Sequence, residues 1–245
     1  MTRLAIACLA LLLAGCGGKD GNGLFPVREG LYREYAYRIK NMDIEIPLRM
    51  TVLSLGVRES GGERVAVELV NGQVPRAYRI DDSGVWRLPA RFWADEWVSL
   101  IEKYRAVSEL EKEIGAQTHR LLPFPPEQGT TWEDTIVTEV LEVVIAPFRR
   151  HFRIEVPVRM RYRIEAVDER VSVPAGNYSG CIRVHGSGSA KYVGDVYIEN
   201  GHVFVEQDEW YCPGVGLTRA HRLEKTDTDV LKQGTFDLEL VHAEG

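Results

Sequence analysis

Short runs of β-branched and aromatic residues, separated by turn-forming residues, dominate the chain from about residue 32 onward. In the N-terminal half these runs cover 32–40, 45–57, 64–70 and 76–81, and pairs such as Asn71-Gly72 lie between them. In the C-terminal half they cover 135–145, 151–167, 178–185, 191–199, 203–211, 217–223 and 236–242. Asn200-Gly201 is the strongest two-residue hairpin signal. The pattern predicts a mainly β, antiparallel fold, as a curved sheet or an open barrel.

One segment breaks this pattern. Its large apolar residues recur at spacings of three or four: Trp93, Trp97, Leu100, Tyr104, Val107, Leu110 and Ile114. Charged residues fill the positions between them, so the sequence predicts one amphipathic helix over about 92–115. Two shorter helices would fit the same spacing.

The N-terminus is typical of a secretory signal. Arg3 precedes an apolar run over 4–14 that is too short to cross a bilayer as a helix. The run ends in Leu13-Ala14-Gly15-Cys16, which resembles the lipobox of bacterial lipoproteins. The resemblance implies that residues 1–15 are a signal peptide, that Cys16 is diacylated, and that 16–23 form a lipidated tether. Gly17 stands where an inner-membrane retention signal would have Asp, so we expect the periplasmic side of the outer membrane.

The remaining 230 residues are long enough for one large β domain or two small ones. The net charge of −6 becomes −7 once Arg3 is removed, and an acidic body argues against nucleic acid as a partner. No second apolar run approaches membrane-spanning length, so we expect membrane attachment through the acyl groups of the N-terminus alone.

An internal repeat divides the chain. Residues 25–32 match 124–132 as Phe-Pro, then Gly, then an aromatic residue, and residues 45–50 match 155–160 at almost every position. We therefore expect a first β-module over 24–90, a helical connection over 91–120 and a second β-module over 121–245. The alternative is that the second module forms one continuous domain with the first. Both copies should be strands, with the Ile, Leu, Val and Met side chains of 46–50 and 156–160 buried and Arg49 and Arg159 pointing away.

The C-terminal half contains two further motifs, Val-Pro-Ala-Gly at 173–176 followed by Cys181, and Glu-Trp-Tyr-Cys-Pro-Gly-Val-Gly-Leu at 209–217. Together with Pro-Phe-Pro at 123–125, Gly129 and Trp132, they resemble a group of uncharacterised bacterial lipoproteins and periplasmic proteins. That resemblance covers about half the chain and implies no catalytic residue, substrate or cofactor. Physically, the Pro-then-Gly order in both motifs predicts turns.

Two cysteines remain once Cys8 is cleaved off and Cys16 is acylated. Cys181 and Cys212 would lie in an oxidising compartment that permits a disulfide. The resemblance adds that Cys212 stands where Ala is expected. Two separate buried thiols fit the sequence equally well, so the pairing stays open at this point.

The chain lacks the usual signatures of catalysis. None of its six histidines has a metal-ligand spacing, and no nucleophile elbow, phosphate-binding loop or calcium loop is complete. We therefore expect no catalytic residue, no metal and no cofactor.

Two features are candidates for binding. Arg153, Arg159, Arg161 and Arg163 alternate with apolar residues along one predicted strand, so they share a face that could hold phosphate or carboxylate groups. The alternative is a solvated face paired with acids such as Glu139 or Glu142. Separately, Trp86, Trp93 and Trp97 could contact an apolar ligand, and their alternative role is to fill the core.

The sequence thus predicts a lipid-anchored protein of the cell envelope that acts as a non-catalytic binding or scaffold module. The alternative is a carrier or sensor of an amphiphilic ligand in an open β-barrel, and a hydrolase is a third possibility. Candidate partners are another envelope protein, a lipid or a cell-wall polymer.

Overall fold

The computed structural model describes residues 23–41, 44–60, 62–89, 116–138, 140–145, 150–194 and 198–245. The first half of the described chain forms β1 (Tyr32–Asn41), β2 (Ile44–Ser60), β3 (Glu63–Val70), β4 (Val74–Asp81), β5 (Gly84–Arg87) and β6 (His119–Pro123). The second half forms β7 (Thr131–Val137), β8 (Glu142–Ile145), β9 (Arg150–Arg153), β10 (Pro157–Val173), β11 (Gly176–Tyr192), β12 (Gly201–Cys212), β13 (Gly216–Thr226) and β14 (Gln233–Glu244).

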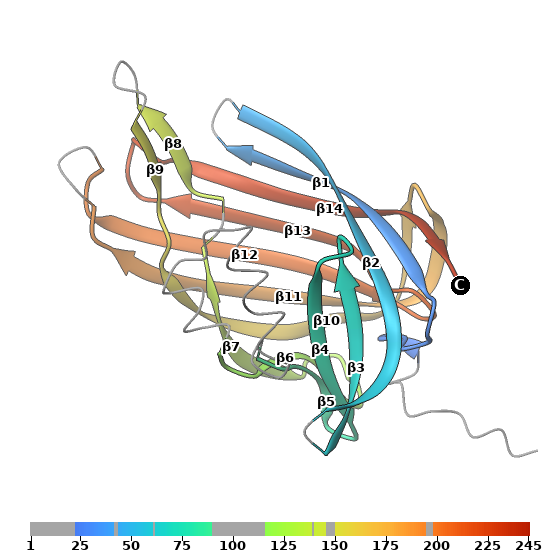
Figure 1. The fold of residues 1–245 in the computed structure, drawn as a ribbon. Coiled ribbons are helices and arrows are strands. Elements are labelled where there is room, and N and C mark those ends of the chain that lie inside the picture. The colour runs from blue at the N-terminus through green and yellow to red at the C-terminus, as the bar shows by residue number, and fades with distance from the viewer. Residues whose placement is uncertain are drawn as a thin grey trace, which may run out of the picture.

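Twelve of these strands form one antiparallel sheet in the order β6-β5-β4-β3-β2-β1-β14-β13-β12-β11-β10-β7. Each half contributes a six-stranded meander, and β1 and β14 join the two meanders. The sheet curves round on itself (Figure 1), and β8 and β9 form a separate hairpin at the end opposite the C-terminus. The predicted mainly β, antiparallel fold is confirmed.

The helix predicted over 92–115 lies outside the described residues. In the part of the chain that is described, no helix has the length and hydropathy needed to cross a membrane.

The two segments that resemble each other in sequence have the same hydrogen bonds. The amide of Gly30 donates to the carbonyl of Ser54 at 2.9 Å, and the amide of Gly129 donates to that of Ile164 at 2.8 Å. Tyr32 is paired with Leu53 in the first copy, and Thr131 with Arg163 in the second. The two pairings follow the offsets of 99 and 110 residues between the sequence matches. The division into modules is a prediction that rests on this shared register.

The repeated arginines also make equivalent contacts. Arg49 of β2 pairs with Glu34 of β1 at 2.9 Å, and Arg159 of β10 pairs with Glu133 of β7. Both arginines are exposed and point away from the core, as expected. Among the acids expected opposite the arginine row, Glu142 is in register with Arg153, Glu139 lies outside the described residues, and Arg159 faces β7.

The burial expected for the repeat holds in one copy only. Val158 and Met160 are fully buried, but Ile46 and Leu48 are 45% and 37% exposed. The difference arises because the end of β2 that carries Ile46 and Leu48 is paired with β1 alone, whereas β3 begins its pairing at Val52. Val156 precedes β10 and is not part of that strand.

Two strand boundaries differ from expectation. β11 is one continuous strand through Gly186-Ser187-Gly188-Ser189, where the sequence suggests a loop. A Cβ at Gly186 would lie 2.5 Å from the Tyr162 ring, so glycine is required there by the close approach of that ring. The hairpin expected at Asn200-Gly201 is also wrong, because β11 ends at Tyr192 and Gly201 already belongs to β12.

The main core lies on the inner face of the curved sheet, the face on which strands from opposite sides of the fold meet. Tyr78 of β4, Tyr162 of β10 and Tyr211 of β12 are buried in this one cluster. A second cluster on the same face contains Tyr35, Val52, Val70 and Leu238. The core therefore closes the interior between the two meanders.

The curved sheet is joined at its two outermost strands by side chains. Among the described residues no backbone ladder links β6 to β7. Instead the Trp132 indole N–H donates to the Arg120 carbonyl at 3.0 Å, and His119 Nδ1 lies 2.7 Å from Asp134 Oδ1. These contacts form the β6–β7 seam, which completes the barrel-like shape.

Candidate functional site

An apolar patch lies on the inner face at the end of the sheet where β1 finishes and β2 and β14 begin. It consists of Tyr37, Ile39, Ile46, Leu48 and Phe236, which the strand register places side by side. Ile46 and Leu48 are the most exposed members, and the rings of Tyr37 and Phe236 lie 5.8 Å apart. Large apolar side chains exposed together on one face are typical of a binding surface.

The lining stays apolar below the patch. Met50 follows Leu48 on the same face of β2 and is half-buried, and Val52 follows Met50 and is buried. Val74 of β4 packs against the same cluster. The inner face thus continues from the exposed patch toward the core without a polar side chain on this part of β2.

Deeper in the barrel the inner face becomes polar. Arg33 of β1 forms a buried ion pair with Glu68 of β3 and also donates to the Val215 carbonyl at 3.3 Å. Burial lowers the pKa of Arg33, but the adjacent Glu68 outweighs burial and raises it, so Arg33 stays charged. An ion pair of this kind fixes the relative position of the two strands that carry it.

A carboxyl group occupies the opposite wall. Glu209 of β12 accepts hydrogen bonds from the Tyr211 hydroxyl at 2.8 Å and the Gln207 amide at 2.7 Å. Burial raises the pKa of Glu209, and burial and Glu209 together raise that of Tyr211 well above its usual value. Tyr211 and Glu209 thus form a hydrogen-bonded hydroxyl–carboxyl pair that is buried in the barrel interior.

The arginine face predicted on one strand is divided in the structure. Arg159, Arg161 and Arg163 are exposed on the outer face of β10. Arg153 belongs to β9, where the strand register places it opposite Glu142. β9 belongs to the separate β8–β9 hairpin and β10 to the twelve-stranded sheet, so the four arginines do not form one row. Arg159 pairs with Glu133, and Arg163 lies 3.7 Å from Glu165. With Glu133 and Glu165 beside Arg159 and Arg163, this face corresponds to the solvated, paired surface described above as the alternative.

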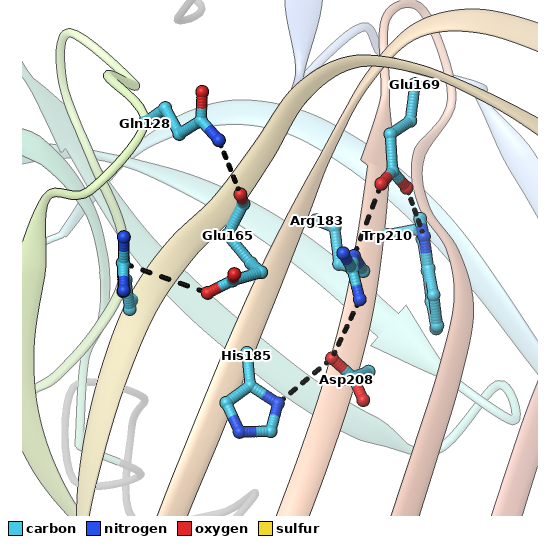
Figure 2. A network of polar contacts seen from close by, with 8 residues as sticks. Gln128, Glu165, Glu169, Arg183, His185, Asp208 and Trp210 are labelled. Atoms are coloured by element: carbon cyan, nitrogen blue, oxygen red, sulfur yellow. Dashed lines mark hydrogen bonds and ion pairs between the residues drawn. The ribbon is translucent and has the colours of Figure 1, made fainter.

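A second polar network lies beside these arginines on the outer face (Figure 2). Arg183 lies between Glu169 at 3.3 Å and Asp208 at 3.9 Å, and His185 contacts the same Asp208 at 3.1 Å. The Trp210 indole donates to Glu169 at 2.9 Å. Each charge in this network has a partner of opposite sign, so the network stabilises strand pairing.

The outer face also carries a groove of about 770 Å³ over β2, β1, β14 and β13. Its charged walls include Arg38, Arg49, Arg219, Asp237 and Glu239. The arginines are paired with acids, Arg219 with Glu239 at 3.0 Å and Arg38 with Glu45 at 3.4 Å. This leaves no charge excess that would select a ligand.

Trp86 does not line the interior. Val85 of β5 is buried on the inner face, so Trp86 points outward, where Arg79 and Arg120 lie over its ring at 5.5 and 5.0 Å. Trp86 therefore cannot contact a ligand in the interior, and the prediction that it does so was wrong. Trp93 and Trp97 lie outside the described residues.

Cys181 and Cys212 form a disulfide, with an S–S distance of 2.05 Å and Cα atoms 4.1 Å apart. The pairing of Ile182 with Tyr211 makes the cysteines neighbours on β11 and β12. Cys212 is followed by the Pro213-Gly214 turn, and the amide of Gly214 donates to the carbonyl of Gly23 at 2.8 Å. The two motif turns, after Val173 and after Cys212, are confirmed.

The described residues hold no group of three or more His, Cys, Asp or Glu side chains placed to bind a metal ion. The inner apolar patch was missed from the sequence, although the alternation of Tyr37, Ile39, Ile46 and Leu48 with polar residues was visible. That alternation shows that these side chains share a face, but it does not show that the face stays uncovered.

No protein-family model matches the chain, and no curated protein matches it. Among solved structures, a candidate lipoprotein from Parabacteroides distasonis has 12% identity and a TM-score of 0.42, covering 90% of this chain and 98% of its own. An exported protein with a YmcC-like fold from Bacteroides fragilis has 9% identity and a TM-score of 0.41, with the same coverage. A LolA superfamily protein from Nitrosomonas europaea has 12% identity and a TM-score of 0.20, covering 90% of this chain and 88% of its own. All three TM-scores are below 0.5, so the function is argued from this chain alone.

Proposed function

We propose that this chain is a lipid-anchored protein of the cell envelope that binds the apolar chain of an amphiphile on its inner face. The observation that carries the proposal is the exposure of Ile46 and Leu48 on that face, at 45% and 37%. A curved inner surface suits a narrow, flexible chain, because side chains from several strands can contact it at once. The proposed role is binding or carriage without catalysis.

The position of the anchor supports this role. Gly23, the last residue of the predicted tether, accepts a hydrogen bond from Gly214 of the Pro213-Gly214 turn, at the opposite end of the strands from the β1–β2 connection. β1 alone is about 33 Å long at the usual rise per strand residue. The apolar patch would thus face away from the attached end, where it could receive a ligand from the periplasm.

Dye displacement tests the proposal. The mature chain 16–245 with Cys16→Ser is titrated with the neutral apolar dye N-phenylnaphthylamine, which is then displaced by tetradecanol. Replacing both Ile46 and Leu48 by Ser should weaken tetradecanol binding about tenfold or more, because each buried aliphatic side chain contributes about 1.5–3 kcal/mol.

Phe204 provides the matched control. It is 47% exposed, like Ile46, but lies between buried residues on the outer face of β12. Phe204→Ser should leave tetradecanol binding unchanged. A wild-type chain that does not bind tetradecanol, or equal losses in the two variants, would overturn the proposal. A protein partner bound at the patch in place of the alcohol would replace the carrier role with a scaffold role.

A further inference from the structure

The inner face of β1, β3, β4 and β5 has more arginines than carboxylates. Arg33, Arg76 and Arg87 lie there with one acid, Glu68. The register places Arg76 directly opposite Glu68, so a cross-strand ion pair would be the ordinary arrangement. Glu68 instead pairs with Arg33 and also contacts the Tyr78 hydroxyl. Among the described residues, the two remaining arginines have no carboxylate of their own.

Within the described chain, the side chains of Arg76 and Arg87 make no hydrogen bond or ion pair with another side chain. Both are half-buried. Arg87 is paired with Tyr78, and Arg76 lies two residues before Tyr78 on the same face, so the two arginines are diagonal neighbours. Diagonal neighbours lie about 7–8 Å apart, with their Cβ atoms somewhat closer, a separation at which two long side chains can contact one anion.

Glu209 of β12 is the acid that the interior places in electrostatic contact with Arg87. Glu209 interacts electrostatically with Arg222 and Arg87, but its oxygens accept from Tyr211 and Gln207. Burial raises the pKa of Glu209, which favours the uncharged carboxyl group. Arg222 is itself paired with Glu224 at 2.6 Å. Since the described residues supply no carboxylate to Arg76 or Arg87, a bound anion would provide the opposite charge that partial burial favours.

We propose that Arg76 and Arg87 bind the anionic group, a carboxylate or a phosphate, of the amphiphile. This inference rests on the proposed function and names the class of its ligand. Val74 adjoins Arg76 on the same face of β4, and Val52 and Met50 continue toward the apolar patch. Ser54 lies six positions after Leu48 on β2 and is opposite Glu68, which is in turn opposite Arg76. The patch and the arginines therefore lie about 20 Å apart along the strand direction.

Three ligands with the same chain and different head groups test the inference: myristate, tetradecyl phosphate and tetradecanol. Each displaces N-phenylnaphthylamine from the mature chain 16–245 with Cys16→Ser. We expect at least one of the two anions to bind tenfold or more tightly than the alcohol, and the preferred anion identifies a carboxylate or a phosphate source. In the variant with Arg76→Gln and Arg87→Gln, the anion should bind no better than tetradecanol, with tetradecanol binding unchanged.

Arg79→Gln is the matched control, because Arg79 lies on the outer face of β4 and is paired with Asp81 at 3.1 Å. It should keep the full preference for the anion. Equal affinities of the three ligands for the wild-type chain would overturn this inference while leaving the proposed function intact, whereas failure to bind tetradecanol would overturn the proposed function. If the double variant does not fold, the wild-type comparison and the single variant Arg87→Gln decide the outcome.

Discussion

Cys181 and Cys212 are both fully buried where β11 and β12 pair, and their bond closes a loop with a sequence separation of 31. Cross-linking a loop of this length stabilises the folded chain by about 3–4 kcal/mol in the chain-entropy model. Replacing both cysteines by Ala should therefore lower the free energy of unfolding in urea by about this amount. Reduced wild-type protein serves as the control. Two free thiols in the unreduced mature protein would show that the bond does not form.

The buried carboxyl group of Glu209 makes the free energy of unfolding depend on pH. Burial raises its pKa in the folded chain, so its favourable contribution is present below the unfolded pKa of about 4.3 and is lost as the pH rises through the folded value. Gln has no carboxyl group to ionise, so the Glu209→Gln variant does not lose this contribution as the pH rises. The free energy of unfolding of the variant, relative to wild type, should therefore increase from acidic to neutral pH.

Urea unfolding at several pH values measures this difference for Glu209. The same substitution at Glu206, exposed on the outer face of β12, serves as the control and should give a flat difference. A flat difference for Glu209→Gln would mean that its carboxyl group is solvated.

At the scale of elements, the β6–β7 seam should be the weakest junction of the sheet. Its contact between His119 and Asp134 is buried, with the side chains 5% and 15% exposed. Asp134→Ala should cost about 1–3 kcal/mol, because it removes the carboxylate partner from a buried polar side chain. Hydrogen exchange should then increase in β6 and β7 before it increases elsewhere.

The outer face supplies a control of the same geometry. His221 and Asp237 also lie 2.7 Å apart, but their side chains are 44% and 46% exposed, and a backbone ladder joins their strands. Asp237→Ala should cost less than about 1 kcal/mol. If the two alanine variants lose the same stability, the seam does not depend on its side chains.

For the whole molecule, attachment is predicted to depend on one side chain, Cys16. Cys16→Ser should abolish labelling with radioactive palmitate and leave the precursor uncleaved or the product soluble. Two acyl chains are needed for stable anchoring, so removing their attachment site should have a complete effect. Cys8→Ser, within the predicted signal peptide, should label normally. A Cys16→Ser protein that is still labelled and fractionates with membranes would contradict the lipoprotein prediction.

The sequence by itself determined the local features of this protein. Alternation of apolar and polar residues set which side chains share a strand face, as at Val158, Met160 and Tyr162. Pro and Gly set the turns after Val173 and Cys212, and the repeat matched segments with the same register. These features follow from residues that are neighbours in the chain, because side-chain period and turn conformation depend on local backbone geometry.

Only the tertiary structure decided which strands lie side by side. The disulfide depends on the pairing of β11 with β12. The separation of Arg153 from Arg159 arises because β9 belongs to a separate hairpin and β10 to the twelve-stranded sheet. Glu68 contacts Arg33 and not its strand neighbour Arg76, because the sheet curves and brings residues of different strands together on its inner face. Contacts of this kind depend on the register and curvature of the whole sheet, which no local pattern specifies.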